Sequence, residues 1–198
     1  MIPFDALILF AGLSLALDVA PGPDNIFVLT QSALYGRRAG ILVTLGLCTG
    51  LVVHTTLVAL GVAALIQASP TAFTVLKTAG ALYLLWLAWG AFRVTAEGLP
   101  AEGAGAMSGW QYYRRGIIMN VTNPKVSVFF LAFLPQFADP GRGAVAPQVF
   151  LLGGVFMILA LGVFGGIAIL AGTLGGWLRR SPRMQVGLKC QAGTVLVV

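Results

Sequence analysis

Charged side chains are scarce in this 198-residue sequence: Lys, Arg, Asp and Glu make up 9% of it, against 58% hydrophobic residues. A soluble domain carries about 25% charged residues. The shortage excludes an ordinary soluble globule and predicts a protein whose surroundings are mostly lipid. Acids are the scarcer charge, because six Asp and Glu stand against twelve Lys and Arg.

Histidine and cysteine are also nearly absent, with one His and two Cys in the chain. Metal sites need clustered His, Cys or carboxylates, so His54, Cys48 and Cys190 predict neither a bound metal nor a disulfide. The cysteines stand in apolar surroundings and are interpreted as small packing residues. No HExxH, GxSxG or Walker A motif occurs. The sequence therefore predicts no enzyme, no cofactor and no ATP-driven transport.

Long apolar runs dominate what is present. A helix needs about 20 apolar residues to cross a bilayer, and six runs are interpreted as helices: 5–34, 39–66, 71–94, 115–137, 146–177 and 184–198. The sequence thus predicts an all-α polytopic membrane protein with about six transmembrane helices. No base precedes Arg37, so we expect the first run to stay as a span rather than to be cleaved as a signal peptide. The last run is short and carries Lys189, which leaves a full sixth span open.

Glycine is abundant, with 26 residues in the chain. Gly46 and Gly50 have the GxxxG spacing that lets two membrane helices approach closely. The fifth predicted helix carries a larger set, which we interpret in the same way: Gly153, Gly154, Gly162, Gly165 and Gly166.

Basic residues gather in alternate loops: Arg37, Arg38, Arg93, Arg114, Arg115, Arg179, Arg180 and Arg183. The other two loops hold only Arg142. Positively charged loops stay in the cytoplasm. We therefore expect a multi-pass membrane protein with its basic loops cytoplasmic, in contact with membrane lipid and not with nucleic acid.

A linker rich in Gly, Ala and Glu, residues 95–114, divides the chain into two runs of three helices, 1–94 and 115–198. An odd number of spans in each half makes the halves antiparallel in the membrane. Inverted repeats with helices interrupted at corresponding places mark binding sites near the midplane. The sequence predicts such a pair of repeats, with the first and fourth helices broken.

The breaks are marked by proline. Pro21, Gly22 and Pro23 interrupt the first apolar run, and Pro124 interrupts the fourth, so helical hydrogen bonding must fail at both places. Broken backbone at membrane depth is tolerated only inside protein or beside a wet cavity. We therefore expect the two breaks to meet at a buried polar site.

Polar residues beside the breaks are the candidates for substrate binding: Asp24, Asn25, Asn120, Asn123 and Lys125. One half supplies an acid and the other a base, and buried charges need partners, so Asp24 or Asp18 is predicted to pair with Lys125. One anionic and one cationic anchor suit a zwitterion such as an amino acid. Asp18, Asp24 and His54 are candidates for proton coupling, because intramembrane acids are usually functional and the ordinary pKa of histidine lies near neutrality.

Purely structural roles stay open as alternatives. Asp24 could only cap the half-helix after the first break, and Lys125 could extend to the membrane interface. Asn120 and Asn123 could only satisfy backbone groups that Pro124 frees. His54 could serve in contacts between helices.

The run Pro21-Gly22-Pro23-Asp24 resembles the PGP signature of the LysE/RhtB amino-acid exporters. Further segments are similar to that family's second, third and fourth helices: Gly46-Leu47, Gly50-Leu51, His54, Leu76-Lys77, Ala79-Gly80-Ala81, Tyr83-Leu84, Trp86-Leu87, Asn120-Val121-Thr122-Asn123-Pro124-Lys125 and Leu134-Pro135-Gln136-Phe137. The resemblance covers about residues 1–180. It implies an inner-membrane permease that exports amino acids or close derivatives, coupled to proton entry.

A divalent-cation exporter of the same superfamily is the alternative function. The scattered His and Cys residues and the positive charge of Lys125 favour an amino acid over a metal ion. The sequence leaves open which amino acid is carried and whether the chain works as a homodimer.

Overall fold

The computed structural model describes residues 2–69 and 107–180 and eight positions between 71 and 86. The predicted helix 184–198, most of the predicted helix 71–94 and Cys190 lie outside the described residues. Cys48 is buried with a free thiol, in agreement with a packing role.

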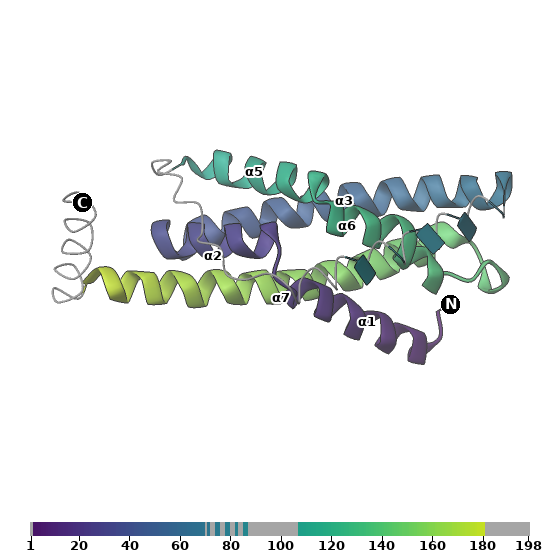
Figure 1. Cartoon of the computed structure of the whole chain (residues 1–198), viewed down its shortest axis with the longest axis horizontal. Helices are drawn as coiled ribbons and strands as arrows, with labels where there is room; N and C mark the ends of the chain where they lie inside the picture. The colour runs from purple at the N-terminus through teal and green to yellow at the C-terminus, as the bar shows by residue number, and fades with distance from the viewer. Residues whose placement is uncertain are drawn as a thin grey trace.

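All the regular structure in this part of the chain is helical, in the order α1 (Phe4–Val19), α2 (Pro23–Tyr35), α3 (Arg37–Ala68), α5 (Gly109–Thr122), α6 (Pro124–Val128), η1 (Phe129–Phe133), η2 (Leu134–Phe137), η3 (Pro140–Arg142) and α7 (Val145–Arg180). The first and fourth apolar runs are each broken into shorter helices, while the second and fifth form the long helices α3 and α7. In Figure 1 these two helices run along the length of the molecule, and α2 and α5 lie beside them.

Two helices begin earlier than the sequence analysis predicted. The turn before α3 shrinks to one residue, Gly36, whose φ of 89° favours glycine. The α5 helix begins at Gly109 rather than at residue 115, because Ser108 and Gln111 form a capping box. The Ser108 hydroxyl accepts from Gln111 N at 3.3 Å, and Gln111 Oε1 accepts from Ser108 N at 2.7 Å. The end of the expected linker is therefore helical.

The described helices fit a membrane protein. Arg37–Gly61 of α3 and Val145–Trp177 of α7 are long and apolar enough to cross a bilayer. Two bent pairs pass the same test when taken together: α1 with α2, bent by 56°, and Gly109–Thr122 with Pro124–Phe137, bent by 52°. By length and composition, this part of the chain therefore holds two helices that can cross a membrane, or up to four spans if each bent pair makes one broken span.

Glycine brings α3 and α5 into close contact, as the GxxxG spacing predicted. A Cβ atom on Gly46 would overlap the carbonyl oxygen of Tyr113, and one on Gly50 would lie 2.6 Å from Oδ1 of Asn120. Gly116 of α5 faces Gly46 in return, since their Cα atoms and backbones leave no room for a side chain. This contact fixes the depth at which α5 presents Asn120 to the centre of the bundle.

The glycines of α7 make close contacts within the described part of the chain only at some positions. Gly153 packs against the Thr55 side chain. At four others, a Cβ atom would meet no atom of the described residues within 4 Å: Gly154, Gly162, Gly165 and Gly166. Close contact is made instead near the end of α7, where Gly172 lies against Arg37 and Gly175 against Ala33. The sequence could not show which side of α7 faces the bundle.

An aromatic cluster fills the core between α1, α7 and the segment after α6. Each of its six rings has a neighbour in the cluster whose ring centroid lies 5.0–5.3 Å away: Phe10, Phe129, Phe130, Phe133, Phe137 and Phe156. The wider π-helical turn η1 supplies three of them, and such turns are frequent at functional sites. The cluster anchors the second broken helix beside the first.

We predict opposite effects for one substitution at two glycines. Gly46→Ala forces α5 away from α3, because its Cβ meets backbone, and lowers the free energy of unfolding by about 1–3 kcal/mol. Gly162→Ala adds its methyl group to an exposed helix position and raises that free energy by about 0.5–1 kcal/mol. Thermal unfolding in detergent measures both. Equal losses at the two positions would contradict the packing described here.

Candidate functional site

The first break lies between α1 and α2. Ala20 and Gly22 leave the helical conformation, with ψ angles of 128° and 176°, and Pro23 takes the first position of α2. Pro21 and Pro23 have no backbone N–H group, so neither can donate a hydrogen bond to a carbonyl of the preceding helix. The last carbonyl groups of α1 are consequently left without all their helical partners.

The second break, between α5 and α6, repeats this local pattern. Asn123 is extended and Pro124 takes the first helical position of α6. The Asn123 side chain caps the new helix, because its Oδ1 accepts from Lys125 N at 3.0 Å. Asn123 thus satisfies a backbone group freed by the break. In both halves a charged residue follows the proline, Asp24 in one and Lys125 in the other.

The Lys125 side chain joins the two breaks. Its ammonium group donates to the carbonyl oxygen of Leu17 at 2.8 Å and to that of Ala20 at 2.9 Å. These carbonyls belong to the C-terminal end of α1, which carries the negative end of the helix dipole. Gly22 leaves room for the ammonium, since a Cβ atom there would lie 3.3 Å from Nζ. Lys125 therefore does not extend to a membrane interface.

The predicted ion pair with Lys125 is not formed. Among the residues that the structure describes, the one carboxylate within 4 Å of a cation is Asp139, at 3.1 Å from Arg142 in an exposed turn. Asp18 and Asp24 attract the Lys125 ammonium electrostatically without being in direct contact with it. The reason is that two carbonyls at a helix end hold the ammonium in place before it reaches either carboxylate.

Asp24 is 3% exposed and is bound from the other half of the chain. Asn120, itself buried, donates from Nδ2 to Asp24 Oδ2 at 3.3 Å. The other carboxylate oxygen, Oδ1, has no hydrogen-bond partner in the described structure. Asn123 lies within electrostatic reach of the same carboxylate, although its Nδ2 makes no hydrogen bond of good geometry among the described residues. The N-cap of α2 is Gly22, with no side-chain cap hydrogen bond, so the contact with Asn120, and not capping, holds Asp24 in place.

Asp18 lies on the opposite side of the first break from Asp24. It is 3% exposed, and its Oδ2 also lacks a hydrogen-bond partner within the described part of the chain. Asn25 closes the break, because its Nδ2 donates to the backbone oxygen of Asp18 at 2.7 Å. Asn25 thus holds the loop in place, with one buried carboxylate on each side of the break.

His54 lies on α3 and contacts Asn120, the residue that binds Asp24. Its Nε2 lies 3.2 Å from the backbone oxygen of Asn120. A carbonyl oxygen only accepts, so Nε2 is the donor and carries a proton. The geometry gives His54 the interhelical contact that the sequence analysis left open, and it positions Asn120 rather than touching a carboxylate.

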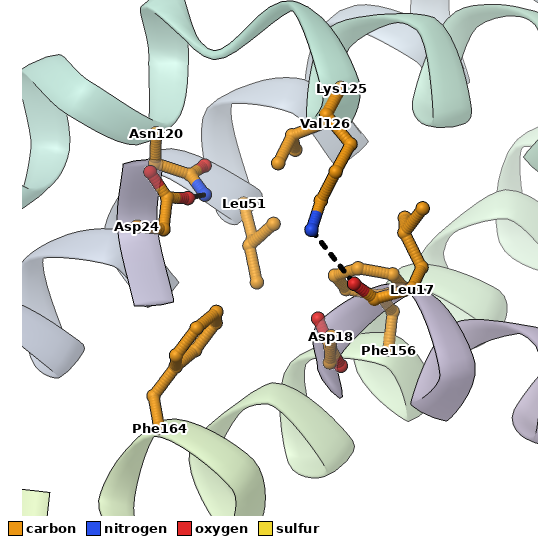
Figure 2. A pocket seen from close by; sticks show the side chains of 9 residues that line it. All are labelled: Leu17, Asp18, Asp24, Leu51, Asn120, Lys125, Val126, Phe156 and Phe164. Atoms are coloured by element: carbon orange, nitrogen blue, oxygen red, sulfur yellow. Dashed lines mark hydrogen bonds between the residues drawn. The ribbon is translucent and has the colours of Figure 1, made fainter. Parts of the chain in front are cut away.

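These groups surround a small cavity, which Figure 2 shows. Asp18, Asp24, Asn120 and Lys125 form its polar side, and apolar side chains complete it: Leu17, Leu51, Val126, Phe156 and Phe164. Its volume of about 10 Å³ is close to what one water molecule requires. The site thus combines two buried carboxylates and an ammonium with an apolar wall.

Sequence reasoning missed the apolar wall. Phe156 and Phe164 come from α7, which the sequence analysis treated only as a packing helix, and Leu51 comes from α3. Apolar residues inside apolar spans carry no distinguishing signal. Ser14 was also missed, although its place one helical turn before Asp18 could have indicated it; its hydroxyl is buried and lacks a hydrogen-bond partner in the described structure.

Comparison with known proteins identifies the family of this chain. The family model for the LysE type translocator matches residues 15–198. The homoserine/homoserine lactone efflux protein of Salmonella typhimurium is 34% identical over 172 residues, which is 87% of this chain and 83% of that protein. The leucine efflux protein of an Enterobacter species is 36% identical over 125 residues, 61% of this chain and 58% of that protein.

An uncharacterized membrane protein of Vibrio cholerae is 32% identical over 184 residues, 93% of this chain and 89% of that protein. No solved structure matches the chain. The family match covers the broken first helix from before Asp18 onward and every residue placed around the cavity. The chain belongs to the LysE family of membrane translocators.

Proposed function

We propose that this protein exports amino acids or close derivatives across a bacterial inner membrane in exchange for protons. The observation that carries the proposal is the cavity at the meeting point of the two broken helices, where Asp18, Asp24 and Lys125 are brought together. Intramembrane charges are costly and mark transport pathways. The efflux of homoserine and leucine by relatives supports an amino-acid substrate.

The chemistry of the cavity suits a zwitterion with an uncharged side chain. The substrate ammonium is placed at Asp24, whose Oδ1 has no partner in the described structure. The substrate carboxylate is placed at Lys125, supported by the positive N-terminal end of α2. Phe156 and Phe164 then form an apolar wall for the rest of the molecule.

Charge balance supports exchange with protons. Two carboxylates face one ammonium, so one negative charge is left over when Asp18 and Asp24 are both ionised. An uncompensated buried charge costs several kcal/mol. The empty site therefore takes up a proton. A zwitterion brings no net charge, but its ammonium group is placed at Asp24 and so competes with the proton for that carboxylate. Substrate and proton then occupy the site in alternation, which is the requirement for antiport.

The structure has the site closed. A cavity of about 10 Å³ holds far less than an amino acid, so export requires the walls to separate. Alternating access in inverted repeats is rocking of one repeat against the other around a fixed site. The two breaks, bent by 56° and 52°, are the natural hinges, and we propose that residues 1–94 and 115–198 are the two repeats, joined by the linker 95–114.

The ends of the helices support a cytoplasmic location for the basic loops. Gly172 near the end of α7 lies against Arg37 at the start of α3, so the basic residues of both segments share one end of the molecule. The start of α5 lies at that end too, whereas the turn with Arg142 lies at the other (Figure 1). The positive-inside rule places the more basic end in the cytoplasm.

A metal-ion exporter is the less favoured function. The Lys125 ammonium is held inside the cavity by two hydrogen bonds. A divalent cation would be repelled by it at close range in a medium of low dielectric constant. A zwitterion uses the same positive charge as an anchor.

We predict that proteoliposomes loaded with labelled amino acids export those with uncharged side chains, leucine-like or homoserine-like, against a gradient, and that a protonophore abolishes this export.

Asp24→Asn and Lys125→Met should each lower export at least tenfold while membrane insertion persists. Asp139→Asn, the same change at an exposed turn, is the matched control and should export normally. Undiminished uphill export with the proton gradient collapsed would refute proton coupling, and normal export by Asp24→Asn would refute the site.

Orientation is tested separately with single cysteines in a background in which Cys48 and Cys190 are replaced by Ala. Arg38→Cys lies at the basic end, and Arg142→Cys at the opposite end. A membrane-impermeant thiol reagent added to intact cells should label Arg142→Cys and not Arg38→Cys. The reverse pattern would show that the basic loops face outward.

A further inference from the structure

The position of the Lys125 ammonium has the character of a cation site. Its two partners, the carbonyls of Leu17 and Ala20, lie at the end of a helix that is broken inside the bundle. In transporters with discontinuous helices, unwound carbonyls and half-helix C-terminal ends coordinate Na⁺ or a proton. Here the same kind of backbone holds a side chain of the protein itself.

The two carboxylates that line the same cavity have oxygens to spare. Asp18 Oδ2 and Asp24 Oδ1 are buried and have no hydrogen-bond partner in the described structure. Both residues are 3% exposed. Figure 2 shows Asp18, Asp24 and Lys125 arranged around one space, from three different elements. Carboxylate and carbonyl oxygens are the ligands that hard cations prefer.

The dimensions also suit a small ion. The cavity beside the ammonium has about the volume of one water molecule, and shortening the Lys125 side chain would enlarge it by the space of the ammonium. The approach of Gly22, where a Cβ would lie 3.3 Å from Nζ, shows how closely the backbone is fitted around the charge. A bare monovalent ion is small enough to replace it.

We propose that the Lys125 ammonium fills a monovalent-cation site formed by the end of α1, Asp18 and Asp24, and thereby takes the place of a coupling Na⁺. The native protein binds no Na⁺ there, because its own tethered cation occupies the carbonyls. When the ammonium is removed, the two carboxylates and the freed carbonyls bind Na⁺ instead. The inference concerns ion binding and does not depend on which substrate is exported.

Proton uptake is the competing way to balance the charge. Without Lys125 the two carboxylates could each be neutralised by a proton, and no cation would enter. The two outcomes separate experimentally, because Na⁺ binding depends on the Na⁺ concentration at fixed pH and protonation does not. The ionic strength must be held constant with choline, which is too large for the site.

The experiment measures thermal unfolding of the purified full chain in detergent at pH 8, with Na⁺ titrated against choline. The variant Lys125→Met should rise in Tm by about 3 °C or more when the Na⁺ concentration reaches ten times its Kd. It should also bind radioactive ²²Na⁺ saturably. The wild type and Lys125→Arg, which keeps a tethered cation, should show neither response.

Two controls locate the site. Arg142→Met removes a cation from an exposed turn and should gain no response to Na⁺, and Lys125→Met combined with Asp18→Asn should lose the response that the single variant shows. A Tm of Lys125→Met that depends on pH alone would overturn the proposal. If Lys125→Met does not fold, the wild type still decides: saturable ²²Na⁺ binding, or Na⁺-dependent stability that Asp18→Asn abolishes, would show that the lysine does not take the place of Na⁺.

Discussion

The contact on which this structure depends is the pair of hydrogen bonds from the Lys125 ammonium to the carbonyls of Leu17 and Ala20. A helix that ends inside a membrane leaves carbonyl groups without partners. Each such group is destabilising, because lipid offers it no hydrogen bond. The ammonium removes that cost and is itself compensated by the helix dipole. One residue from the second half of the chain thus stabilises the break in the first half.

The polar network around this contact is held in place by apolar packing. Gly46 and Gly50 bring α5 against α3, which sets the position of Asn120 beside Asp24. His54 fixes the backbone of the same asparagine from α3. A fully satisfied network would be rigid, but unpartnered oxygens remain on both carboxylates within the described structure. The site is therefore held in place by its neighbours while one oxygen of each carboxylate stays without a partner among the described residues, as the proposed binding of a proton or a substrate ammonium requires.

Much of this arrangement could be predicted from the sequence. Proline beside glycine, with charges inside apolar runs, indicated two broken helices and the residues at each break. The prediction of a direct ion pair with Lys125 was wrong, because a sequence shows the charges but not the backbone carbonyls that compete for them. The apolar wall from Phe156 and Phe164 of α7 was missed for a related reason. Which face of an almost uniformly apolar helix turns inward is decided by its neighbours, not by its own pattern.

The central claim is that the breaks of the two halves form one site, and a double-mutant cycle between Asp24 and Asn120 tests it most directly. Asp24→Ala, Asn120→Ala and the double variant would be compared by thermal unfolding in detergent, with Asp139→Ala and Asn120→Ala as a distant control pair. We expect a coupling energy of about 0.5–3 kcal/mol for the first pair and additivity for the control pair. Additivity in both pairs would contradict the claim, because residues on separate sites do not share an interaction.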